Sequence, residues 1–163
     1  RDIIARAYAE KVGAGAQVPT TEDVSAYYSN NPALFKERRV YTIRELLVQA
    51  DADQTAELRR RLEAAKTFDE FVDHVRATGL RASAQQLVRA SEQLPLNQLE
   101  AFARWKDGET KVDVLPKGLR VWYLAQSRTQ PVSEDQARAA ISTFLLNERK
   151  QKLIEEDLKS LRA

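Results

Sequence analysis

The sequence predicts an α+β fold in which a small antiparallel sheet is surrounded by helices. Three observations predict it. Residues 39–48 form a run of β-branched, aromatic and aliphatic residues that ends at polar turn-forming residues. Two further apolar runs, 110–115 and 119–125, are joined by Pro-Lys-Gly, which is a hairpin signal. Most of the remaining chain carries apolar residues at helical spacing.

Composition excludes several classes of function. The 163 residues include 26 Lys and Arg against 24 Asp and Glu, with the two signs interspersed, so no surface for nucleic acid is expected. No apolar run approaches the roughly 20 residues that span a bilayer, so no membrane span is expected in this chain. The absence of cysteine excludes disulfides, thiolate zinc sites and a cysteine nucleophile.

Two helices are predicted before the first strand. The first has one apolar side, formed by Ile3, Ile4, Ala7, Tyr8 and Val12. It should end at Gly13, where backbone freedom makes continuation costly. The second should begin at the threonine caps Thr20 and Thr21, and Pro32 should end it.

The predicted strand 39–48 carries one charge on each face. By alternation, Arg44 lies on one side and Glu45 on the other, each among mostly apolar neighbours. A charge in such surroundings usually has a partner. We therefore expect Glu45 to be paired.

Two helices and a weaker strand should follow. Helix 54–66 is amphipathic, and helix 68–78 is predicted to start at the cap Thr67 and to stop at Gly79. Residues 82–88 are predicted as a short edge strand. A short helix carrying Leu99, Phe102 and Trp105 should precede the hairpin.

Residues 133–162 contain neither proline nor glycine and open with the capping box of Ser133 and Gln136. They predict one helix of about 45 Å, apolar at both ends and solvated between residues 147 and 152. Its far end should pack on the first helix. The residues expected to meet are Ile3, Ile4, Tyr8 and Val12 with Leu153, Ile154, Leu158 and Leu161.

The order of these elements resembles that of the parvulin-type peptidyl-prolyl isomerases, in particular the SurA-like and PrsA-like foldases, with the EpsD-like exopolysaccharide-associated branch most similar. The segments that carry the resemblance are 24–35, 41–48, 67–71, 94–95, 105–109 and 118–124. The resemblance implies a parvulin-like domain over 37–130. It also implies a helical, chaperone-like unit formed by 1–36 and 131–163.

Parvulins rotate a prolyl amide, whose uncatalysed barrier is about 18 to 20 kcal/mol. The family uses two histidines on adjacent strands and an apolar cup for the proline ring, without a cofactor or a metal. The histidine positions fall at Glu45 and Arg120 in this sequence, so both histidines are missing. The candidate substrate-binding residues are Leu94, Leu99, Phe102 and Trp122.

The substitutions leave three functions open. The first is a periplasmic chaperone or assembly factor for extended polypeptide, with isomerase activity weak or lost. The second is a working isomerase that uses Glu45 with Tyr41. The third is a structural interaction domain of an exopolysaccharide export assembly. The implied partners are unfolded or proline-containing polypeptide and export or polysaccharide-assembly proteins, and the implied location is the periplasm or cell envelope.

The other chemically suggestive residues have simpler interpretations. His74 has no partner in the sequence that would make a metal site or a triad. Asp51 and Asp53 are expected to cap a helix, and arginines 59–61 to lie on a solvated face. Because the two histidine positions share a cup, we also expect Glu45 and Arg120 to form an ion pair that replaces the catalytic cluster.

Overall fold

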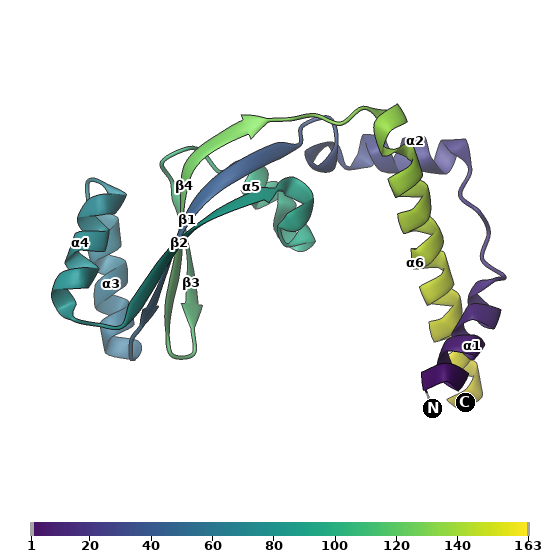
Figure 1. Cartoon of the computed structure of the whole chain (residues 1–163), viewed down its shortest axis with the longest axis horizontal. Coiled ribbons are helices and arrows are strands. Elements are labelled where there is room, and N and C mark those ends of the chain that lie inside the picture. The colour runs from purple at the N-terminus through teal and green to yellow at the C-terminus, as the bar shows by residue number, and fades with distance from the viewer. Residues whose placement is uncertain (1, 163) are drawn as a thin grey trace. The chain divides into compact units, whose positions relative to one another are not determined.

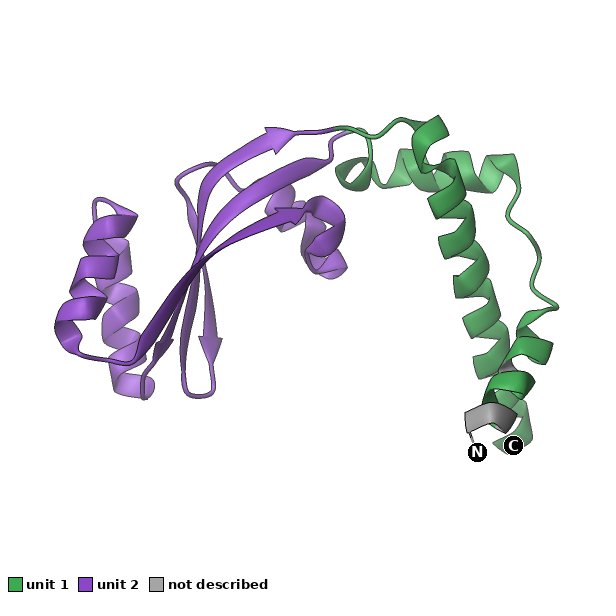
Figure 2. Cartoon of the chain, in the orientation of Figure 1, with its two compact units in different colours: residues 1–36, 131–163 green, residues 37–130 purple. Residues whose placement is uncertain are grey.

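The computed structural model describes the backbone of residues 2–162, together with the side chains of residues 5–8 and 10–162. The chain divides into two compact units (Figure 2). One contains residues 1–36 and 131–163, and the other contains residues 37–130. The predicted α+β fold is confirmed: a four-stranded antiparallel sheet is surrounded by helices, and the first and last helices of the chain pack together.

The sheet belongs to the unit 37–130, and its strand order is β2-β1-β4-β3 (Figure 1). The strands are β1 (Arg39–Gln49), β2 (Ala82–Ala90), β3 (Thr110–Leu115) and β4 (Gly118–Thr129). The run 39–48 therefore forms a central strand, and both β2 and β3 are edge strands. β1 and β4 pair in register except at an irregularity between Thr42 and Ile43.

One face of the sheet is covered by α3 (Ala52–Ala64) and α4 (Phe68–Thr78). The core on this side is formed by Leu46, Val48, Leu58, Phe68, Phe71, Val72, Val75, Leu119 and Val121. The predicted caps are present. Asp51 accepts from the backbone N–H of Gln54, and α4 stops at Gly79, whose φ of 74° is left-handed.

The opposite face of the sheet is covered by three short helices, η2 (Ser91–Gln93), η3 (Leu96–Gln98) and α5 (Leu99–Ala103). Its core consists of Tyr41, Ile43, Leu94, Phe102, Trp105 and Leu124. We call this side of the sheet the cup face, because it carries the candidate site.

The turn between β3 and β4 needs its glycine. A Cβ at Gly118 would lie 2.0 Å from the carbonyl oxygen of Val48, far inside contact distance. The two-residue connection Pro116–Lys117 is one residue shorter than the sequence suggests, because Gly118 already belongs to β4.

The other unit consists of α1 (Asp2–Gly13), α2 (Thr21–Asn30), η1 (Pro32–Leu34) and α6 (Glu134–Arg162). Its core joins α2 to the start of α6 through Val24, Ala137 and Ile141, with Phe35 stacked on Tyr28. Thr20 caps α2, and Ser133 and Gln136 form the predicted capping box of α6.

Two expectations for α6 need correction. Its middle is not simply solvated, because Arg149 donates to a carboxylate oxygen of Asp23 at 2.9 Å and to the carbonyl of Gln17 at 3.0 Å. α1 packs on α6, but Tyr8, Leu158 and Leu161 remain exposed. The side chains of Ile3 and Ile4 lie outside the described residues. Within residues 2–162, no helix is long and apolar enough to cross a membrane.

Candidate functional site

Glu45 lies at the centre of the cup face and is buried, with 8% of its surface exposed; the other buried polar residues among those described, Thr55 and Ser91, lie in α3 and η2. It stands between Gln85 on β2 and Trp122 on β4, which are its direct neighbours in the register. One carboxylate oxygen accepts from Gln85 Nε2 at 2.6 Å, and the other accepts from Trp122 Nε1 at 2.7 Å. Glu45 is therefore paired, as expected, but its partners are two neutral hydrogen-bond donors.

The predicted ion pair between Glu45 and Arg120 is wrong. Arg120 lies on the same face, but the residue opposite it on β1 is Leu47, two residues beyond Glu45. On its other side Arg120 faces Asp113 of β3 and forms an ion pair with it. A carboxylate directly opposite is a nearer partner than one placed diagonally, so the guanidinium turns towards β3.

A cavity of about 220 Å³ opens beside this network. Its lining includes Phe102 and Trp122, whose ring centroids are 6.1 Å apart, together with Pro95, which precedes η3, and Gln98 of η3. Small-molecule sites usually measure about 300 to 1,000 Å³. This cavity is smaller, of a size for a single side chain.

The four predicted substrate-binding residues do not all line the cavity. Phe102 and Trp122 do. Leu94 is buried beneath them in the same core cluster, and Leu99 is half-buried at the start of α5, outside the lining. The structure thus places two of the four on the cavity wall and one behind it.

Phe102 is held in place by β1. The hydroxyl of Tyr41 donates to the carbonyl of Phe102 at 3.2 Å, and Arg39 Nη1 donates to the carbonyls of Phe102, Ala103 and Trp105 at the end of α5. These bonds satisfy carbonyl groups that a helix end leaves without intrahelical partners. They also engage the Tyr41 hydroxyl in a buried bond, away from the cavity.

Lys111 and Asp113, which carry no signal in the sequence, line the cavity, and Gln85 lies beside Glu45 outside the lining. Lys111 places its ammonium 5.0 Å from the ring centroid of Phe102, and Asp113 holds Arg120 at the rim. Gln85 completes the bonding of Glu45. Alternation along β2 and β3 shows which of their residues share a face. It shows which residues lie near Glu45 only once the register between the strands is known.

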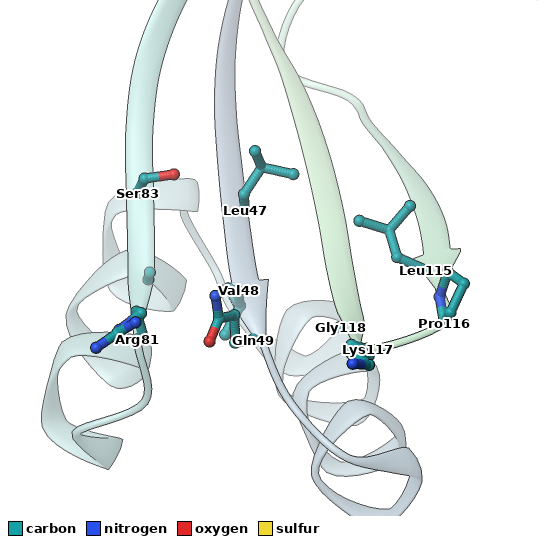
Figure 3. A pocket seen from close by; sticks show the side chains of 10 residues that line it. Leu47, Val48, Gln49, Arg81, Ser83, Leu115, Pro116, Lys117 and Gly118 are labelled. Atoms are coloured by element: carbon teal, nitrogen blue, oxygen red, sulfur yellow. The ribbon is translucent and has the colours of Figure 1, made fainter.

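A second hollow of about 560 Å³ lies where β1 ends, β2 begins and β3 turns into β4. Its lining is mostly apolar: Leu47 and Leu115 lie on either side of β4, where Gly118 carries no side chain (Figure 3). Arg81 and Lys117 stand at its rim. Leu47 belongs to the same face as Glu45, so this hollow continues the cup face beyond Arg120.

His74 is half-buried on α4, the helix that covers the opposite face of the sheet, so it belongs to a different side from the cavity. No cluster of three or more His, Cys, Asp or Glu side chains with metal-binding geometry occurs among the described residues.

Comparison with known proteins finds a matching protein family. The profile of the PPIC-type PPIase domain matches residues 19–139. A search of curated proteins found no significant match.

Two solved chains are similar in structure. Both come from work on SurA-like chaperones of Campylobacter jejuni, namely the virulence factor PEB4 and the periplasmic protein Cj1289. Each is 16% identical to this chain, with TM-scores of 0.37 and 0.38. The matches cover 98% and 99% of this chain and 67% and 59% of the solved chains.

Proposed function

The chain belongs to the PPIC-type PPIase domain family, and we propose that it binds extended polypeptide as a chaperone or assembly factor, with isomerase activity weak or lost. The observation that carries the proposal is the bonding of the two residues that stand where the family has histidines. Glu45 is held by Trp122 and Gln85, and Arg120 is held by Asp113. Glu45 is engaged by hydrogen bonds in a buried position, whereas the ion pair of Arg120 is exposed, so the proposal rests chiefly on Glu45.

Binding and catalysis make different demands on this site. Rotation of the prolyl amide requires polar groups that stabilise the twisted form more than the planar one. Binding requires only a surface that accepts the proline ring, and the wall of Phe102 and Trp122 provides one. The site has an apolar wall, and its polar side chains at Glu45 and Arg120 are bonded to other side chains.

The alternative of a working isomerase that uses Glu45 with Tyr41 has weaker support. The Tyr41 hydroxyl is buried and donates to Phe102, and Tyr41 is only 2% exposed. A general acid or hydrogen-bond donor must reach the reacting group within about 3 Å. Tyr41 would have to leave its bond and its core position to do so.

A proline-containing peptide with a coupled protease tests the proposal on the whole chain. We expect isomerisation at the uncatalysed rate, and we expect the peptide to bind with a change in tryptophan fluorescence. Phe102→Ala should weaken binding by about tenfold or more, because it removes one of the two aromatic side chains of the cavity wall, and truncating an aromatic anchor usually costs more than about 1 kcal/mol in binding. Leu99→Ala is the matched control, since Leu99 lies outside the cavity lining and its truncation should leave binding unchanged.

A large rate enhancement that Glu45→Ala abolishes would overturn the proposal in favour of the working isomerase. The client and the compartment are part of the proposal. Suppression of aggregation of an unfolded protein by the whole chain supports the chaperone role. Recovery of the protein in the periplasmic fraction supports the location implied by the SurA-like resemblance.

An EpsD-like function would give different results in these experiments. A role as a structural domain of an exopolysaccharide export assembly predicts co-purification with export or polymerase proteins and no affinity for unfolded peptides. Among the residues that the structure describes, no contact favours this role over polypeptide binding, so it stands as the outcome that would replace the chaperone function.

A further inference from the structure

The outer edge of β2 lacks the devices that normally protect an edge strand. From Ala82 to Val88 it contains no charged residue, no proline and no glycine. Its side chains are mostly exposed, and the strand pairs with β1 along its whole length without a bulge. Edge strands are usually blunted by charges, prolines or bulges because their free backbone groups attract other strands.

The register shows which backbone groups of β2 point away from the sheet. The N–H of Gln49 donates to the carbonyl of Arg81, so Arg81 bonds to β1. In an antiparallel pair every second residue of a strand bonds to the same neighbouring strand. Ser83, Gln85 and Leu87 therefore bond to β1. The backbone N–H and C=O groups of Ala82, Ala84, Gln86 and Val88 face outwards.

One end of this edge is closed by the protein itself. The outward carbonyl of Val88 accepts from the guanidinium of Arg89 at 3.0 Å, and the outward N–H of Ala90 donates to Gln93 Oε1 at 2.8 Å. Among the described residues, the outward groups of Ala82, Ala84 and Gln86 have no such partner. The open part of the edge thus runs from Ala82 to Gln86.

The opposite edge of the sheet differs. β3 is shorter, and it carries Lys111 and Asp113 within its six residues. Charges in an edge strand are the commonest protection against further pairing. The two edges of the sheet are therefore unequal. Of the two, only β2 has a stretch, Ala82 to Val88, in which outward backbone donors and acceptors are not accompanied by charged side chains.

We propose that the outer edge of β2 binds an extended polypeptide segment as a fifth strand of the sheet. The segment is recognised by its backbone, needs no proline, and is uncharged in its middle with acidic residues towards its ends. Arg81 and Arg89 bracket the open edge and supply the complementary charge, and neither has an ion-pair partner among the described residues. This inference rests on the proposed polypeptide-binding function.

The same two arginines disfavour one register in which a second copy of the chain could be the occupant. Symmetric antiparallel pairing of two β2 strands about Gln85 would place Arg81 of each copy opposite Arg89 of the other. Like charges directly opposite each other across strands are destabilising. An acidic-ended client segment meets the same positions with opposite charge.

The test uses the whole chain and an unstructured peptide without proline, in which a Ser-Val-Thr-Val-Ser-Val core is flanked by aspartates. We expect this peptide to bind the wild type. We expect Gln86→Pro to weaken binding about two- to tenfold, because the substitution removes an outward N–H and leaves the bonds to β1 intact. Gln86→Ala keeps that N–H and should bind as the wild type does.

Two controls separate the edge from the rest of the molecule. Val114→Pro removes an outward N–H from β3, and we expect it to leave binding of this peptide unchanged. The same peptide N-methylated at every residue of its core carries no N–H group on either edge, so it should lose binding to the wild type. That measurement decides the question even if Gln86→Pro fails to fold.

The outcomes distinguish this inference from the proposed function. Equal binding of the methylated and unmethylated peptides would overturn the edge site, and so would a wild type that binds a proline-containing peptide but not this one. A wild type that binds neither peptide would overturn the proposed function as well. Concentration-dependent dimerisation that Gln86→Pro abolishes would show a second copy, not a client, as the occupant.

Discussion

At the scale of single residues, the bonding of Glu45 is the feature that decides what the cup face can do. Its carboxylate satisfies the indole N–H of Trp122, and that indole forms part of the cavity wall. We predict that Glu45→Leu destabilises the fold by about 1.5 to 3 kcal/mol, the usual contribution of a hydrogen bond to a charged group. The measurement is denaturant unfolding of the whole chain.

A double-mutant cycle isolates the pair. Glu45→Leu and Trp122→Phe together should cost less than the sum of the two single substitutions, because the second removes the donor that the first leaves unpaired. The matched cycle of Glu45→Leu with Arg120→Met should be additive. Coupling in the Arg120 cycle and additivity in the Trp122 cycle would contradict the structure.

The sequence predicted part of this arrangement. Alternation along residues 39–48 placed Glu45 among apolar neighbours and indicated that it needs a partner. It could not name the partner, because the choice between Trp122 and Arg120 depends on a shift of two residues between β1 and β4. Register is set by the turn and by the packing of both faces, and neither can be read from one strand alone.

At the scale of elements, an ion pair fastens η2 to the start of β1. Arg38 donates to Glu92 at 2.8 Å and also to the carbonyl of Gln130. The hydrogen bonds from the Arg38 guanidinium hold the pKa of Glu92 below its usual value, and the same contact raises the pKa of Arg38. η2 leads directly into the segment that covers the cup face.

The pH dependence of stability follows from the lowered pKa of Glu92. A carboxyl with a lower pKa in the folded state contributes stability above its unfolded pKa, and this contribution is lost as the pH falls through the folded value. Glu92→Gln should therefore lower the free energy of unfolding at pH 7 and have little effect in strong acid. The effect should stay below about 1 kcal/mol, since the pair is partly exposed.

Urea unfolding of the wild type and of Glu92→Gln at neutral and acid pH measures this difference. Glu100→Gln is the control, because Glu100 is an exposed carboxyl on the neighbouring helix α5 without an ion-pair partner among the described residues. A Glu92→Gln deficit that persists or grows as the pH falls would contradict the role of the ion pair.

Elements whose signals are local were predicted well. The caps Thr67 and Asp51 and the stop at Gly79 lie within a few residues of the helices that they bound, so the sequence shows them directly. The polar middle of α6 was misread because its partner is distant. Arg149 reaches Asp23, and a contact of that kind leaves no periodic trace in either segment.

At the scale of the whole molecule, the sheet unit is inserted between the two halves of the helical unit. The chain enters and leaves it at adjacent points. The N–H of Val132 donates to the carbonyl of Phe35 at 2.9 Å on the helical side, and the N–H of Gln130 donates to the carbonyl of Arg38 at 2.8 Å on the sheet side. Insertions are tolerated where the ends of a unit lie close together.

Each unit has its own hydrophobic core. The two clusters of the sheet unit contain only residues between 37 and 130, and the cluster of the helical unit contains none of them. We therefore predict that residues 37–130 fold alone with a single cooperative unfolding transition. The fragment should bind the proline-containing peptide as the whole chain does, because every residue that lines the cavity lies within it.

The reciprocal deletion is the stricter test of the same arrangement. Replacing residues 37–130 by a short Gly-Ser linker should leave α2 packed on α6, because Phe35 and Val132 are already in backbone contact and the linker closes a small gap at low entropic cost. Circular dichroism should show a helical protein that melts cooperatively. Ile141→Ala, which truncates a buried residue of that core, should lower the melting temperature of both the deletion variant and the whole chain. If the deletion variant is unfolded while the fragment 37–130 folds, the helical unit depends on the inserted domain, and the two units are not independent.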